Sequence, residues 1–147
     1  MAIALSKEKV QAEHGMMMIY SFIALMLTNV LVLILANLMA PQHVVLGTYS
    51  ISYWWAVYHS MFKLSVISVF IMPLVTLYEW KKKTIFTPNQ WMATYFFVNF
   101  FVIWEITRFA ENLGFGVSSW GVILILAVIF DMAQGMVMMS IGKLIKM

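Results

Sequence analysis

The amino-acid sequence predicts an all-α integral membrane protein, a four-helix bundle with four transmembrane helices in one domain, residues 1–147. Two observations predict this class. Of the residues, 63% are hydrophobic and only 10% are charged, and the mean hydropathy is +0.91, which is typical of membrane proteins. Four apolar runs also reach the roughly 20 residues that a spanning helix needs, at about 16–39, 52–78, 90–113 and 120–141. The short connections between them favour up-down-up-down packing.

Local signals mark the ends of the third and fourth runs. Thr87, Pro88 and Gln90 form a helix start, with a capping Thr, Pro at the first helical position and Gln three residues after the cap. Gly114 is placed to end the third helix, because glycine accepts the left-handed conformation that is common there. Ser118 or Ser119 is the expected cap of the fourth helix. The third span is therefore expected to continue as far as residue 113.

The placement of positive charge orients the bundle. Lysines flank the N-terminal end of the first run, follow the second run and close the chain, at Lys7, Lys9, Lys81, Lys82, Lys83, Lys143 and Lys146. The other two loops, 41–50 and 114–119, contain neither Lys nor Arg. By the positive-inside rule, both termini and the central loop are cytoplasmic. The sequence thus predicts a multi-pass protein of the cell membrane whose immediate partner is the lipid bilayer.

Several activities find no signature in the sequence. The chain has no cysteine, which excludes disulfides, iron–sulfur clusters and thiolate zinc sites. It contains no glycine-rich phosphate loop, no GxSxG and no HExxH. The net charge of +3 is small and scattered, so nucleic acid is not an expected partner. We therefore predict no catalytic residue and no metal site, and an enzyme is not favoured.

The sequence favours neither a haem nor a copper site. A haem with two histidine ligands needs two imidazoles at one depth, and only His59 lies inside an apolar run. Met132, Met136 and Met139 share a helix face, and thioethers are ligands that select Cu(I). Methionine is also an adaptable packing residue, and no Cys or His accompanies this stripe. The sequence predicts no cofactor.

Five titratable residues on three of the predicted spans share one layer of the membrane and form the candidate site. A charge in hydrocarbon is costly, so such residues are candidates for function. With a rise of ~1.5 Å per residue, Lys63 lies roughly 3 Å to the outer side of the membrane midplane and Asp131 roughly 3 Å to the inner side. The others lie roughly 6–10 Å outward. This candidate intramembrane charge cluster comprises His59, Lys63, Glu105, Arg108 and Asp131.

Helical spacing predicts that these charges face one another inside the bundle. Three polar side chains continue the same faces and are expected to support the cluster, namely Ser60, Asn112 and Gln134. Gly135 would permit close approach of another helix. We expect Lys63 to contact Asp131 or Glu105. Arg108 is expected near Glu105, His59 or Glu111.

Two functions follow from this pattern, and the sequence leaves both open. One is an ion- or proton-coupled transporter or channel component, in which Asp131 or Glu105 changes its protonation state. The alternative is a structural or accessory membrane protein, a subunit or assembly factor, whose buried ion pairs only fix helix packing. The balance leans to transport, because Asn or Ser would fix packing at lower cost. The small size also favours a homo-oligomer or a place in a larger membrane complex.

Overall fold

Four long helices dominate the computed structural model, which describes the backbone of residues 2–145 and the side chains of residues 13–143. Lys7, Lys9 and Lys146 fall outside the described side chains. The elements in chain order are α1 (Ala2–Met39), β1 (Val44–Leu46), α2 (Tyr53–Lys82), α3 (Pro88–Arg108), the single turn α4 (Ala110–Leu113), β2 (Phe115–Val117) and α5 (Trp120–Ile145).

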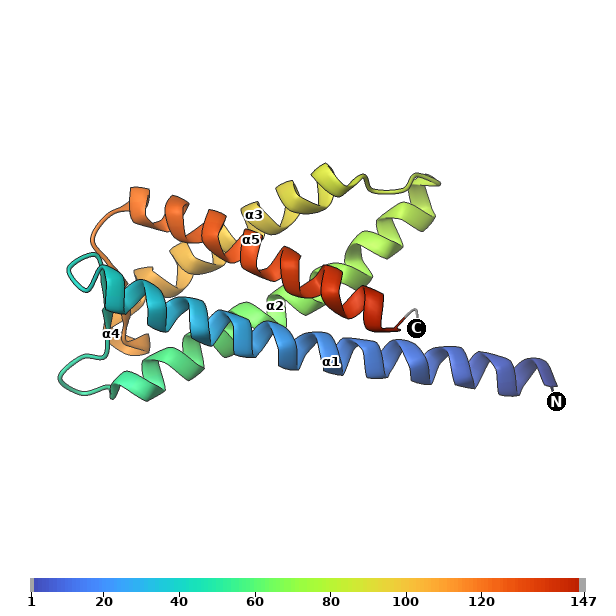
Figure 1. The fold of residues 1–147 in the computed structure, drawn as a ribbon, viewed down its shortest axis with the longest axis horizontal. Helices are drawn as coiled ribbons and strands as arrows, with labels where there is room; N and C mark the ends of the chain where they lie inside the picture. The colour runs from blue at the N-terminus through green and yellow to red at the C-terminus, as the bar shows by residue number, and fades with distance from the viewer. Residues whose placement is uncertain (1, 146–147) are drawn as a thin grey trace.

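The long helices form a ring in which each one contacts two neighbours. The contacts join α1 to α2, α2 to α3, α3 to α5, and α5 back to α1. Figure 1 shows α1 and α5 in front, with α2 and α3 running diagonally behind them. The start of α1, the end of α5 and the loop between α2 and α3 lie at one end of the bundle, whereas the loops with β1, β2 and α4 lie at the other. Successive long helices therefore run in opposite directions.

Three of the helices are long and apolar enough to cross a membrane, judged by length and composition, within the described residues. These segments are Glu13–Met39, Tyr53–Lys82 and Trp120–Lys143. Their outward side chains are apolar and exposed, for example Leu27 at 67% and Ile125 at 61%, as contact with lipid requires. The helix α3 does not belong to this group, because its 21 residues include Gln90, Asn99, Glu105 and Arg108.

The start of the third helix follows the sequence signal, but its end does not. The Thr87 hydroxyl accepts from the Gln90 N–H at 3.3 Å, while the Gln90 side chain accepts from the Thr87 N–H at 2.9 Å, so the predicted capping box is confirmed. The prediction that the helix continues to residue 113 is wrong. The backbone leaves the α conformation at Phe109 (φ −104°, ψ 34°), and α4 follows as a separate turn. The turn ends at Gly114 with φ 76°, as glycine allows.

A two-stranded antiparallel sheet joins the loops at the end opposite the termini, which an all-α prediction did not include. Val44 pairs with Val117 and Leu46 with Phe115. Further backbone bonds extend this connection, from the Gly47 N–H to the Gly114 carbonyl at 2.7 Å and from the Ser118 N–H to the His43 carbonyl at 3.0 Å. The fold is therefore mostly helical, with a small sheet that fixes both loops to each other.

The apolar core runs between all four long helices. On α2 the buried positions recur at helical spacing, at Val57, Met61 and Leu64, as expected for one face of a helix. Side chains from the other helices complete this core, among them Leu33, Val102, Ile103, Ile106, Ile123, Leu126 and Phe130. This packing decides which neighbouring positions turn inward and which turn to the sides of the bundle.

Candidate functional site

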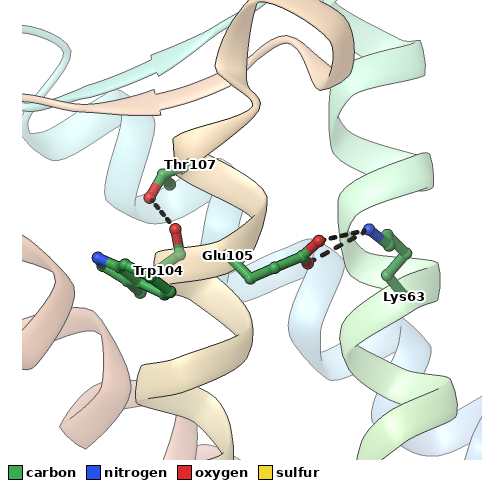
Figure 2. Close-up of polar contacts among 4 residues, drawn as sticks. All are labelled: Lys63, Trp104, Glu105 and Thr107. Carbon is green, nitrogen blue, oxygen red and sulfur yellow. Dashed lines mark hydrogen bonds and ion pairs between the residues drawn. The ribbon is translucent and has the colours of Figure 1, made fainter.

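The helices α2 and α3 are joined by an ion pair. The Lys63 Nζ lies 3.3 Å from both carboxylate oxygens of Glu105, and Figure 2 shows the two side chains reaching toward each other from α2 and α3. Glu105 is one of the two partners expected for Lys63. The side chains remain 34% and 43% exposed, respectively. The expectation that these charges are buried inside the bundle is therefore wrong.

Neighbouring core residues explain why the pair lies at the side. Leu64 and Ile106, which follow Lys63 and Glu105 in sequence, are fully buried. Successive residues of an α-helix differ by about 100° in direction. When Leu64 and Ile106 point into the core, Lys63 and Glu105 must point to the flank of the bundle.

Two other members of the predicted cluster contact aromatic rings instead of charges. The guanidinium carbon of Arg108 lies 5.5 Å from the centre of the Trp104 ring, a cation–π contact. The His59 ring stacks on Trp55, with centres 5.3 Å apart and an angle of 18° between the planes. Within the described residues, Arg108 makes no ion pair with Glu105, His59 or Glu111.

The remaining predicted members lie apart from the ion pair. Asp131 is half-buried on α5 and, among the residues whose side chains are described, has no hydrogen-bond or ion-pair partner. Asn112 is exposed on α4, which the break at Phe109 separates from α3. Ser60 is buried, and its hydroxyl has no partner in the described part of the chain. The structure therefore supports a Lys63–Glu105 pair but not a buried cluster of five charges.

The methionine stripe and Gly135 lie on open faces of α5. Met132, Met136 and Met139 are 59–64% exposed. A Cβ added at Gly135 would meet no neighbour within 4 Å, so the close helix approach expected there is absent from the described residues. Those residues also contain no group of three or more His, Asp or Glu that could hold a metal ion.

The interior instead contains a network of uncharged polar side chains, one from each long helix. Gln134 on α5 is its centre: the Nε2 atom donates to the Oδ1 atoms of Asn29 at 2.8 Å and Asn99 at 3.2 Å. The Gln134 Oε1 atom accepts from the Nδ2 atom of Asn99 at 3.1 Å, and the Nδ2 atom of Asn29 donates to the Ser65 hydroxyl at 2.9 Å. All four side chains are at most 2% exposed. We call these four residues the amide network.

The amide network joins α1, α2, α3 and α5 at one level. Neutral amides can bond across helices without the cost of burying a charge, and such bonds specify how helices align in an apolar surrounding. Sequence reasoning identified Gln134 only as support for the charges and missed Asn99. The position of Asn99 in the sequence could have indicated its role, because it lies at the middle of α3 between apolar neighbours.

The described surface also has one shallow hollow of about 210 Å³ between α1 and α2. Its lining is apolar throughout, formed by Met18, Ile19, Phe22, Val66, Val69 and Phe70. Such a lining offers no group that binds or polarises a polar solute. It suits an acyl chain or an apolar side chain.

Fold and site together define a small helical membrane protein with a neutral hydrogen-bonded interior and an ion pair at its side. No protein-family model matches the chain, and neither a curated protein nor a solved structure is significantly similar to it. The geometry of the amide network and of the lateral ion pair is therefore the basis for assigning a function to this protein.

Proposed function

We propose that this chain is a four-span accessory membrane protein that makes lateral contacts within the bilayer, not one that passes a solute through its own bundle. One observation carries the proposal. The ion pair between α2 and α3 lies on a lateral face, whereas the interior is occupied by neutral side chains bonded to one another. The polar groups that remain available for contact are thus on the side of the protein.

The length and surroundings of α3 support a fourth span. At ~1.5 Å per residue its 21 residues extend over about 31 Å, close to the ~30 Å of a hydrocarbon core. Its central Asn99 is bonded inside the bundle, and Glu105 is paired with Lys63. Both polar groups therefore have partners at membrane depth.

Cysteine labelling on either side of α2 tests whether that helix crosses the membrane and in which direction. Lys81, Lys82 and Lys83 favour a cytoplasmic loop after α2. A cysteine introduced at Gln42 should react with an impermeant reagent applied from outside, and one at Thr84 should not. If both positions react from the same side, α2 does not cross the membrane and the proposed topology is contradicted.

The interior favours a structural role for the amide network. Both donors of the Gln134 amide group serve Asn29 and Asn99, and the carbonyl accepts from Asn99. Between this level and the β1–β2 end of the bundle, the core is filled by apolar side chains such as Leu33 and Phe130. An ion at this level would have to displace bonds that hold four helices together.

The lateral ion pair favours a contact role for the α2–α3 side. A partly exposed charge facing hydrocarbon costs several kcal/mol by some measures. A protein surface that covers Lys63 and Glu105 removes that contact with lipid. Association with another protein through this side of the bundle is therefore energetically favourable.

Transport remains the second candidate, because of Asp131. This half-buried carboxyl group has no described ion-pair partner, and it lies one helical turn before Gln134 of the amide network. A carboxyl group at membrane depth without a fixed counter-charge is suited to exchange a proton. A transport role would centre on this residue instead of on the Lys63–Glu105 pair.

Reconstitution distinguishes the two candidates. Purified protein in liposomes with an internal pH-sensitive dye, a salt gradient and a set membrane potential should show the same proton and cation flux as protein-free liposomes. Flux that disappears in Asp131→Asn but persists in Met132→Leu, a matched exposed neighbour, would overturn the accessory role in favour of transport. Circular dichroism of each variant controls for folding.

A further inference from the structure

The lateral ion pair belongs to a larger surface on the α2–α3 side. One turn from Lys63 on α2 lies Ile67, which is 36% exposed. On α3, Phe101 lies one turn from Glu105 and is 59% exposed. We call Lys63, Ile67, Phe101 and Glu105 the pair face. It combines one charge of each sign with exposed apolar and aromatic side chains.

We propose that the pair face is the contact between two copies of this chain, related by a two-fold axis along the membrane normal. The inference rests on the proposed function, in which this side of the bundle makes lateral contacts. It names the partner as a second copy inserted in the same orientation. Most homo-oligomers are closed and symmetric, and a two-fold contact uses the same patch on both subunits.

The depth of the two charges fits this symmetry. The Nζ of Lys63 and the carboxylate of Glu105 are 3.3 Å apart, so the two groups lie at nearly the same level along the bundle. A rotation of 180° about the membrane normal keeps that level and places α2 of one copy opposite α3 of the other. Lys63 then faces the partner's Glu105, and Glu105 faces the partner's Lys63.

Charge complementarity selects a second copy over an unrelated occupant. A different protein would have to present one acidic and one basic side chain at the same depth and with the matching separation. A second copy meets this condition by symmetry alone. The four charges then form a closed ring in which each side chain has two partners of opposite sign, and their exposed fractions are withdrawn from lipid.

The apolar members of the pair face add packing to the charge ring. Lipid chains are as apolar as these side chains, so helix association in a bilayer depends on close packing and polar contacts. Ile67 and Phe101 are the exposed apolar side chains that such packing would use. The copies are thus expected to meet along α2 and α3 below the ion pair.

Cross-linking tests which side of the bundle forms the contact. Because the chain has no cysteine, single cysteines can be introduced without altering others. A bilayer-reconstituted mixture of Ile67→Cys and Phe101→Cys should give disulfide-linked dimers upon oxidation. Leu31→Cys on α1 and Ile125→Cys on α5, exposed at 60% and 61%, are matched controls and should not. Equal cross-linking at the control positions would overturn the proposal.

Charge exchange between copies gives a sharper test. Lys63→Glu carries two acidic groups in the pair face, and Glu105→Lys carries two basic groups, so each variant alone should lose dimers. Mixed together, each acidic side chain opposes a basic one across the two-fold axis, and dimers should return. Energy transfer between labelled copies in phosphatidylcholine liposomes at fixed protein-to-lipid ratio measures both results. Circular dichroism and gel filtration check that the variants fold.

Several outcomes would overturn the dimer. One is a wild-type protein that single-molecule photobleaching in liposomes counts as monomeric. Another is a dimeric wild type whose two charge variants do not associate when mixed. If either variant fails to fold, the cysteine mixture in the otherwise unaltered chain still decides the question. A monomer would leave the flux experiment and the accessory role unaffected, whereas Asp131-dependent flux would defeat that role without removing the dimer.

Discussion

Gln134 and Lys63 both place a polar side chain in the middle of an apolar helix, yet they end in opposite surroundings. Gln134 is 2% exposed and bonds to two other helices. Lys63 is 34% exposed and contacts one residue on one neighbouring helix. The amide network thus fixes the four helices relative to one another, while the pair face presents its charges at the side of the bundle.

The physical reason lies in the cost of burial. Removing an ion from water costs several kcal/mol even after relaxation, and an ion pair recovers this only with excellent geometry. Burying a neutral amide costs far less free energy than burying an ion. Hydrogen bonds between membrane helices contribute about 0.6 kcal/mol on average and up to about 1.7 kcal/mol. Four neutral side chains can therefore align four helices at a cost that four buried charges would exceed.

The largest expected effect comes from removing the centre of the amide network. Gln134→Leu deletes three hydrogen bonds and leaves Asn29 and Asn99 with buried unpaired groups. Because each such group costs roughly 1–3 kcal/mol, the free energy of unfolding should fall by at least about 2 kcal/mol. Unfolding by denaturing detergent, followed by circular dichroism, measures this. Met136→Leu, at an exposed position of the same helix, should unfold like the wild type.

An unchanged stability of Gln134→Leu would contradict the assignment of helix alignment to the amide network. The comparison with Met136→Leu is needed because both variants carry the same new side chain in α5. Only the interior variant removes bonds between helices. The difference between them therefore isolates the network from any general effect of leucine on helix α5.

A second large effect is expected where the sheet meets the helices. Gly114 has φ 76°, and a Cβ there would lie 2.8 Å from Ala56 Cβ and from Ile51 Cγ2. Gly114→Ala should therefore cost about 1–3 kcal/mol through backbone strain and crowding. Gly135→Ala is the control: its added Cβ meets no neighbour within 4 Å, and alanine is favoured over glycine in a helix by up to about 1 kcal/mol. Opposite signs of the two effects are the expected result in thermal unfolding.

The helices were predictable because their signals are local. Apolar length marked where α1, α2 and α5 lie, and the capping box at Thr87 marked the start of α3. The sheet was not predictable in the same way, since its strands have three residues each and show no periodicity. The early end of α3 has no proline or glycine to announce it. After this break the chain continues through α4 into β2.

For the site, the sequence predicted some of the residues but not where their side chains lie. The contact between Lys63 and Glu105 was one of two expectations, and helical spacing alone could not tell the interior from the flank. That choice depends on Leu64 and Ile106 occupying the core. Asn99 bonds to Gln134, 35 positions away in sequence, and Gln134 bonds to Asn29, 105 positions away. A single sequence holds no record of such proximity.

A smaller effect within the network distinguishes bonds between helices from bonds within one helix. Ser65→Ala removes the partner of the Asn29 Nδ2 atom and should cost about 1 kcal/mol. Ser68→Ala is the matched control, because the Ser68 hydroxyl donates to the Leu64 carbonyl of its own helix. That carbonyl remains bonded in α2 without it. Equal losses of stability in the two variants would argue against a specific contribution of Ser65.

The smallest expected effect on folding comes from the pair face. Lys63→Met removes the Glu105 partner, but Glu105 is 43% exposed and in detergent can be solvated by water and head groups. Partly exposed ion pairs contribute about 0–1 kcal/mol, so the unfolding of Lys63→Met in detergent should shift by less than about 1 kcal/mol. A loss of about 3 kcal/mol or more, the expectation for a fully buried pair, would show that this ion pair holds the bundle together as the amide network does.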